Sequence, residues 1–265
     1  MMQNERMDIR MIALDLDGTL MGPDGHVSER NRAVLAQAAA AGVFVVPCSG
    51  RAMEMISPEI LNLTGVRYAV TSGGGAAYDL LTGEELVYNT LPEEIAHEVT
   101  ELVLSHGCRI EFYGGRSVYS PEKQAPGCTA QEIHNWIAAN AGSIVKLDLI
   151  FGEKTAPLAA IREALRDRTD LLLSAASSRN LEVNAADGGK GDALRALGKK
   201  LGITTQQIMA CGDHLNDLSM LRTVGLPVAM GNAVPEAKAV AAYVTKTNAE
   251  DGVAAAVERF VFGKV

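Results

Sequence analysis

The chain has 265 residues, of which 48% are apolar and 21% charged, the balance of a protein that folds around a hydrophobic core. Acidic residues outnumber basic ones by 32 to 24, which gives a formal charge of −8. Nucleic acids and anionic membranes attract proteins through basic groups, so this balance predicts neither kind of partner. An anionic substrate would have to be held by a local positive site, formed by a metal ion, a basic side chain or backbone N–H groups.

The cysteine content and the first residues bear on the cellular compartment. The four cysteines form no Cys-X-X-Cys pair and are expected to be reduced thiols; they are Cys48, Cys108, Cys128 and Cys211. The apolar run from Met11 is interrupted by Asp15 and Asp17, so a signal peptide is not predicted. No stretch predicts a membrane-spanning helix. We therefore expect a cytoplasmic protein, either a monomer or a small homo-oligomer.

Strands alternate with helices at the start of the chain. Apolar runs at 11–16, 43–46 and 68–71 predict short strands, and Ser28 can cap a helix that ends near Gly42. Such alternation is typical of a parallel sheet with helices on both faces.

The pattern changes after residue 81. The elements predicted there are hairpin turns at 81–83 and 114–115, helices at 92–105, 129–141 and 157–168, and strands at 144–151 and 181–183. Together they predict an α+β insert of roughly a hundred residues, which is an ordinary domain size.

The strand–helix alternation returns after about residue 186. The predicted elements are strands at 208–211, 227–230 and 243–245, and helices at 216–223, 233–240 and 252–260. We therefore predict an α/β fold, in which residues 1–81 and 186–265 form a Rossmann-like, doubly wound parallel sheet. Residues 82–185 would form the inserted α+β domain.

The first predicted strand ends in Asp15-Leu16-Asp17-Gly18-Thr19. Open α/β sheets bind ligands at the carboxyl edge of their strands, so both carboxylates can reach one crevice there. Two neighbouring anions beside an apolar sheet need a compensating cation, and oxygen ligands favour Mg²⁺. The alternative is a helix cap or turn formed by Asp17 alone, which explains a pair of carboxylates less well.

A second acidic segment, 212–217, follows another predicted strand and contains Asp213, His214, Asn216 and Asp217. Alone it could be a helix-capping segment. On the same sheet edge as Asp15, it is better explained as a second set of metal ligands. His214 is expected to be a solvated surface residue.

Two further segments could bind phosphate. Ser49-Gly50-Arg51 ends a strand and offers a hydroxyl and backbone N–H groups, although a helix N-cap explains it equally well. Lys190 lies among glycines, before a helix predicted from Asp192, where a flexible ammonium can reach a phosphate. By itself it would be an ordinary surface lysine.

These four segments, in their order along the chain, resemble the motifs of the haloacid dehalogenase superfamily. The segments at 228–233 and 248–253 are similar to those of its Cof-type subfamily, which carries a type IIB cap domain. The resemblance covers the whole predicted sheet region, whereas the insert matches in size and position. It implies a phosphoric monoester hydrolase that acts on a small phosphorylated metabolite, such as a sugar phosphate.

The resemblance also implies a role for each motif residue. Asp15 would be the nucleophile and form an aspartyl-phosphate, and Asp17 would act as general acid and then as general base. Mg²⁺ would bind the side chains of Asp15 and Asp213 and the backbone carbonyl of Asp17. The residues expected to hold or support the phosphoryl group are Leu16 and Gly50 through N–H groups, Ser49, Lys190 and Asn216, with Asp217 in support.

Some points stay open at this level. Ser49 stands where the family usually has Thr, and Gly74 where it often has Asn.

The insert would close over the site as a cap. Its polar candidates, each expected to be an ordinary surface residue, are Arg109, Glu111, Arg116, Tyr119 and His134. A phosphomutase, or a catalytically silent module that binds a phosphorylated ligand, are the alternative functions.

Overall fold

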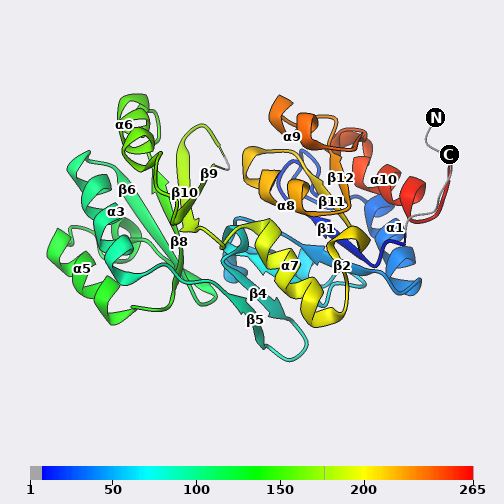
Figure 1. Cartoon of the computed structure of the whole chain (residues 1–265), viewed down its shortest axis with the longest axis horizontal. Helices are drawn as coiled ribbons and strands as arrows, with labels where there is room; N and C mark the ends of the chain where they lie inside the picture. The colour runs from blue at the N-terminus through cyan, green and yellow to red at the C-terminus, as the bar shows by residue number, and fades with distance from the viewer. Residues whose placement is uncertain (1–7, 176, 265) are drawn as a thin grey trace.

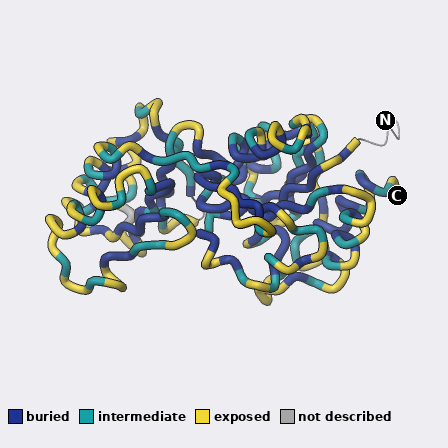
Figure 2. The backbone as a smooth tube through the Cα atoms, turned by 90° about the horizontal axis from the view of Figure 1, so that it is seen from below, coloured by how far each residue is buried: buried dark blue, intermediate teal, exposed yellow. Residues whose placement is uncertain are grey.

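The computed structural model describes residues 8–175 and 177–264, and every structural statement refers to these ranges. Figure 1 shows two lobes. The insert comprises residues 93–185, from α3 to β10, and the main lobe comprises the other described residues. Figure 2 shows buried segments within both lobes, and each lobe has its own large cluster of buried apolar side chains.

The main lobe is built on a five-stranded sheet with the order β13-β12-β11-β1-β2, and all neighbouring strands are parallel. Its strands are β1 (Met11–Leu14), β2 (Phe44–Pro47), β11 (Ile208–Gly212), β12 (Leu226–Ala229) and β13 (Tyr243–Val244). Strand β1 lies in the centre and is fully buried, as its continuous apolar sequence requires.

A three-stranded antiparallel sheet continues from β2. It consists of β3 (Tyr68–Thr71), β4 (Ala76–Asp79) and β5 (Glu85–Tyr88), and single parallel bridges join β2 to the β3 region. The predicted turn at 81–83 is the connection between β4 and β5. Strand β5 therefore pairs with a main-lobe strand although it lies after residue 81. The domain boundaries given above stay a prediction.

Helices surround the main sheet (Figure 1), and α1 packs against α10 while α7 packs against α8. They are α1 (Glu29–Ala40), α2 (Pro58–Leu61), α7 (Lys190–Leu201), α8 (Leu218–Thr223), α9 (Pro235–Val240) and α10 (Gly252–Phe260). The 3₁₀ turns are η1 (Met53–Met55), η2 (Ser72–Gly74), η3 (Thr205–Gln207), η4 (Leu215–Asp217) and η5 (Asn248–Glu250). Ser28 caps α1 as predicted, because its side chain accepts a hydrogen bond from the Asn31 N–H.

The insert is an antiparallel sheet with helices on one face. The strand order is β7-β6-β8-β10-β9, from β6 (Arg109–Gly114), β7 (Ser117–Tyr119), β8 (Ile144–Ile150), β9 (Leu171–Ser174) and β10 (Asn180–Ala185). Its helices are α3 (Glu93–Ser105), α4 (Pro121–Gln124), α5 (Ala130–Ala139) and α6 (Thr155–Leu165). In Figure 1, α3, α5 and α6 lie on the side of this sheet away from the main lobe.

The structure confirms the predicted α/β fold, a Rossmann-like parallel sheet with an inserted α+β domain. Several details differ from the prediction, and three of them concern the insert and the helix that begins at Lys190. Strand β9 was not predicted, α7 begins at Lys190 rather than at Asp192, and α6 spans Thr155–Leu165 rather than 157–168. None of the helices in the described ranges combines the length and apolar character that crossing a bilayer requires.

Candidate active site

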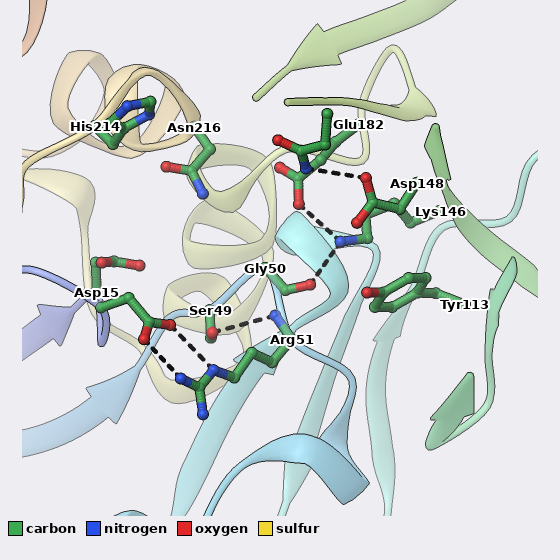
Figure 3. A pocket seen from close by; sticks show the side chains of 12 residues that line it. Asp15, Ser49, Gly50, Arg51, Tyr113, Lys146, Asp148, Glu182, His214 and Asn216 are labelled. Carbon is green, nitrogen blue, oxygen red and sulfur yellow. Dashed lines mark hydrogen bonds and ion pairs between the residues drawn. The ribbon is translucent and has the colours of Figure 1, made fainter. Parts of the chain in front are cut away.

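The predicted motif residues meet at the carboxyl edge of the main sheet. Asp15 directly follows β1, Ser49 follows β2, and Asp213 follows β11. Because β1 pairs in parallel with both β2 and β11, the ends of these three strands lie side by side. They border a cavity of about 560 Å³, its open mouth included, which is closed on the other side by the insert (Figure 3).

Lys190 joins two carboxylates beneath this cavity. Its ammonium donates to Asp15 Oδ1 over 2.6 Å and to Asp217 Oδ1 over 2.7 Å, and Lys190 is fully buried. Burial lowers the pKa of Lys190, but the charges of Asp15 and Asp217 outweigh it and raise that pKa. Burial, and next the charge of Asp217, raise the pKa of Asp15 well above its usual value, while Lys190 opposes the shift. A protonated Lys190 therefore compensates a site with an excess of carboxylates.

Further hydrogen bonds fix the carboxylates of Asp217 and Asp213. Asp217 Oδ2 accepts hydrogen bonds from the N–H groups of Asp213, over 2.9 Å, and His214, over 3.1 Å. Asp213 Oδ1 accepts a hydrogen bond from the Thr19 hydroxyl over 2.8 Å. Burial raises the pKa of Asp213 to about 6, although the Thr19 hydroxyl lowers it in part. The carboxylates of the two acidic segments are thus held by hydrogen bonds within the protein.

Gly18 is required between the two acidic segments. Its φ of +82° lies in the left-handed region, and an added Cβ would lie 2.4 Å from Asp213 Oδ2. A side chain at this position would therefore displace the Asp213 carboxylate.

The donor set fits a hard divalent cation. Asp15, Asp213 and Asp217 each offer a carboxylate oxygen, and these oxygens lie within 4.8 Å of one another. Oxygen-only ligands at this spacing suit Mg²⁺ or a similar ion. Two of these residues were predicted as ligands, and Asp217 was predicted in support. The Asp17 side chain does not belong to the group, and a ligand role for its backbone carbonyl stays a prediction.

Asp17 instead pairs with Arg51. The guanidinium donates to Asp17 Oδ2 over 3.0 Å and to Oδ1 over 2.6 Å, in a bidentate contact at the cavity. The Asp17 side chain is 62% exposed, so this pair contributes only ~0–1 kcal/mol to stability. In this conformation the carboxylate expected to act as a general acid is directed at a guanidinium.

Ser49 is buried and is not a helix N-cap. Its hydroxyl accepts a hydrogen bond from the Arg51 N–H over 3.2 Å, and the next helical turn, η1, begins four residues later with Ala52 as its N-cap. Ser49, Gly50 and Asn216 line the cavity. The Leu16 side chain lies in the hydrophobic cluster of the main lobe, so only its backbone can serve the site.

The insert supplies one wall of the cavity through residues that the sequence analysis missed: Tyr113, Lys146, Asp148, Asn180 and Glu182. They come from β6, β8 and β10. A signal was present, since polar residues alternate with buried apolar ones along β8 and β10 and so mark one polar face of the sheet.

The five candidates named for the insert do not line the cavity; Arg109 and Arg116 are exposed as expected, whereas Glu111 is buried and Tyr119 and His134 are half-buried. Arg109 pairs with Glu122, Glu111 with Lys123, and Arg116 donates to the Gly83 carbonyl. Tyr119 stacks on Trp136, and His134 contacts His97 and Glu101.

His214 is not the solvated surface residue that the sequence suggested. It is half-buried and lines the cavity, and its Nδ1 lies 3.0 Å from the Ala175 carbonyl oxygen in the insert. The prediction was wrong because it could not include the approach of the insert to this loop.

This arrangement of strand-end carboxylates and a buried lysine on a Rossmann-like sheet defines a known class of hydrolase. Residues 12–257 match the family model of the haloacid dehalogenase-like hydrolases, and the chain belongs to this family. The predicted recognition, a Cof-type member of the haloacid dehalogenase superfamily, and the prediction of a hydrolytic enzyme are confirmed.

Several named proteins resemble the chain over nearly its full length. The 5-amino-6-(5-phospho-D-ribitylamino)uracil phosphatase YcsE of Bacillus subtilis is 32% identical, with 98% of each chain covered. The HMP-PP phosphatase of Escherichia coli O157:H7 is 29% identical, with 87% of each chain covered.

Solved structures share the fold. A haloacid dehalogenase-like hydrolase from B. subtilis superposes with a TM-score of 0.80 at 26% identity, over 94% of this chain and 99% of that one. The HAD subclass IIB sugar phosphatase BT4131 gives a TM-score of 0.81 at 20% identity, over 95% and 98% of the two chains, which supports the fold.

Proposed function

We propose that this chain is a Mg²⁺-dependent phosphatase that hydrolyses small phosphorylated metabolites through an aspartyl-phosphate on Asp15. The observation that carries the proposal is the buried network in which Lys190 bridges Asp15 and Asp217 beside Asp213. The full-length relatives named as phosphatases support the reaction class.

The geometry supports attack by the free oxygen of Asp15. Lys190 occupies Oδ1, which leaves Oδ2 to attack phosphorus while the bond from phosphorus to the leaving-group oxygen breaks. Asp17 would give a proton to that oxygen, and it must first exchange its contact with Arg51. Water then attacks the aspartyl-phosphate, Asp17 takes the proton of that water, and Asp15 returns to a free carboxylate.

The remaining motif residues would bind the phosphoryl oxygens. We assign this role to the N–H groups of Leu16 and Gly50, the Ser49 hydroxyl, Lys190 and the Asn216 amide. A Mg²⁺ ion held by Asp15, Asp213 and the Asp17 carbonyl would neutralise charge on these oxygens. Asp217 holds Lys190 and the Asp213 backbone, which makes it a positioning residue.

The cavity is lined by residues of both lobes, which supports a separate role for each lobe. We propose that residues 1–81 and 186–265, together with β5, form the catalytic core and that the rest of residues 82–185 forms the cap. The core side of the cavity carries the reacting groups and the cap side contacts the leaving group. Selection of the substrate would then depend on the cap.

The direct test is phosphate release from an aryl phosphate. We expect activity with Mg²⁺, none in excess chelator, and a loss of roughly 10³-fold or more in Asp15→Asn, which removes the nucleophile. Asp24→Asn, an exposed carboxylate on the same loop, is the matched control and should keep activity. Full activity in Asp15→Asn would refute the proposal. With a sugar phosphate as the substrate, isomerised product in place of free phosphate would indicate a phosphomutase.

A further inference from the structure

The polar face of the insert sheet carries three carboxylates in one row. In the strand register, Glu182 on β10 lies opposite Asp148 on β8, and Asp148 lies opposite Glu111 on β6. Like charges directly opposite each other on neighbouring strands are unfavourable unless something compensates them. The row therefore needs cations or hydrogen-bond donors.

The two outer carboxylates have cationic partners. Lys123 lies 2.7 Å from Glu111 Oε1, outside the cavity lining. Lys146, fully buried, lies 2.8 Å from Glu182 Oε1 and also donates to the Gly50 carbonyl oxygen over 2.7 Å. The closest cations are thus engaged at the two ends of the row.

The central carboxylate, Asp148, has a different environment. Its Oδ1 accepts a hydrogen bond from the Asn180 amide over 2.9 Å, and within the described ranges no lysine or arginine forms an ion pair with it. Burial is the main cause that raises the pKa of Asp148, partly offset by Lys146. The half-buried carboxyl group thus faces the cavity with one hydrogen-bond donor, the Asn180 amide, in the described part of the chain.

Asp148 also lies in the right place to contact a substrate. It lines the same cavity as Asp15, and Figure 3 shows the two on opposite sides of the view, with Ser49 and Gly50 between them. Its neighbours on that wall include the Tyr113 hydroxyl, which stays neutral because burial raises its pKa to about 12. This wall offers hydrogen-bond acceptors to whatever group the phosphate is attached to.

We infer that Asp148 is a specificity-determining residue that selects phosphomonoesters whose leaving group carries hydroxyl or amino donors and rejects those with a second anionic group. A donor on the substrate adds a hydrogen bond to Asp148, whereas a second anion meets Asp148 and Glu182, and the neighbouring Lys146 already pairs with Glu182. This inference rests on the proposed function and names its substrate class.

The first test compares three small substrates with the wild-type protein: glycerol phosphate, propyl phosphate and phosphoglycerate. They share a three-carbon skeleton and differ in hydroxyl and carboxylate groups. We expect kcat/KM for glycerol phosphate to exceed that for propyl phosphate by about tenfold, with phosphoglycerate the poorest, because a hydrogen bond to a charged group is lost or an anion is added. A preference for phosphoglycerate would overturn the inference without any variant.

The second test uses Asp148→Asn, which keeps the shape and removes the charge. The preference for glycerol phosphate over propyl phosphate should shrink to about threefold or less, and phosphoglycerate should improve about tenfold relative to them. Glu111→Gln is the matched control, since this carboxylate ends the same row outside the cavity lining and should leave all ratios unchanged.

Unchanged ratios in Asp148→Asn, or the same shift in Glu111→Gln, would contradict the inference. If Asp148→Asn does not fold, Asn180→Ala, which removes the amide that orients Asp148, should weaken the donor preference in the same direction. If the wild type hydrolyses an aryl phosphate but the Asp148 variant keeps the wild-type selectivity, only the inference about Asp148 is contradicted. Absence of any hydrolysis would contradict the proposed function as well.

Discussion

Lys190 allows three carboxylates to lie close together at the end of a buried parallel sheet. It is fully buried and donates to Asp15 and Asp217, while Asp217 in turn accepts two backbone N–H groups. Buried charges are stable only when they are paired and hydrogen-bonded. The remaining excess of negative charge is expressed in the raised pKa values of Asp15 and Asp213, and it makes the site receptive to a divalent cation.

These pKa shifts predict how metal binding depends on pH. Ligating carboxylates must be deprotonated, and burial raises the pKa of Asp213 to about 6. Below that pH protons compete with the metal, so Mg²⁺ affinity should fall by up to about tenfold per unit as pH drops from about 6 to 5, and level off above about 7. Titration calorimetry across this range measures it.

The sign of the stability effect follows from the same shift. The pKa of Asp213 is higher in the folded protein than in the unfolded chain, so ionisation of this carboxylate costs stability as pH rises. Mg²⁺ binds the ionised form, so it should raise Tm more at about pH 8 than at about pH 5. Glu250→Gln, which changes an exposed carboxylate outside the group of possible metal ligands, should behave as the wild type. An Mg²⁺ affinity that does not change between these pH values would show that Asp213 is not a ligand.

Gly18 gives a second test at the residue scale. In Gly18→Ala the added methyl group meets Asp213 Oδ2 at 2.4 Å, so the carboxylate must move, and we expect the Mg²⁺ concentration for half-maximal activity to rise by about tenfold or more. Gly25→Ala is the matched control, because Gly25 has a similar φ of +79° but nothing within 4 Å of an added Cβ. Equal effects of the two substitutions would assign the result to backbone strain alone.

At the scale of elements, the candidate site forms where the ends of three parallel strands face the polar side of the insert sheet. The ends of β1, β2 and β11 place the candidate catalytic groups, and the polar face of the insert sheet lies opposite them across the cavity. Lys146 connects the two, since it pairs with Glu182 in the insert and donates to the Gly50 carbonyl oxygen in the main lobe. This buried ion pair ties the cap wall to the loop that contains Ser49.

The ion pair predicts a characteristic pattern of stabilities. Lys146→Met leaves Glu182 buried without its partner and should lower the free energy of unfolding by about 3 kcal/mol or more. The double variant Lys146→Met/Glu182→Leu should recover at least half of this loss, because it removes both charges. Urea unfolding monitored by the fluorescence of Trp136, the one tryptophan in the chain, reports on the insert directly.

The exposed pair of Arg166 and Glu163 serves as the control for this series. Arg166→Met should change stability by less than about 1 kcal/mol, since surface ion pairs contribute little. A double variant as unstable as Lys146→Met would contradict the account of a paired buried charge.

At the scale of the whole molecule, the sequence predicted the main sheet well because each strand is a short apolar run followed by turn or motif residues. The strand β9 was missed for a physical reason. Leu171-Leu172-Leu173-Ser174 has no alternating pattern, and it is an edge strand whose conformation depends on pairing with β10. Local sequence does not encode such a partner.

The candidate site divides in the same way. Asp15, Ser49, Lys190 and Asp213 could be found because each lies in a short segment after a strand or before a helix. The cap wall comes singly from three strands, and which faces meet the cavity depends on strand register and on how the insert packs. The contact of Arg51 with Asp17 and that of His214 with the insert are likewise tertiary and have no local signal.

The central claim is that Asp15 carries the phosphoryl group during turnover, and rapid acid quench tests it most directly. Wild-type protein is mixed with a phosphate-labelled aryl phosphate, stopped within the first turnover and digested, and the label is located by mass spectrometry. We predict label on the peptide that contains Asp15, decaying as inorganic phosphate appears, and none in Asp15→Asn. Phosphate release at the full rate with no labelled protein, or with label on another residue, would contradict the account.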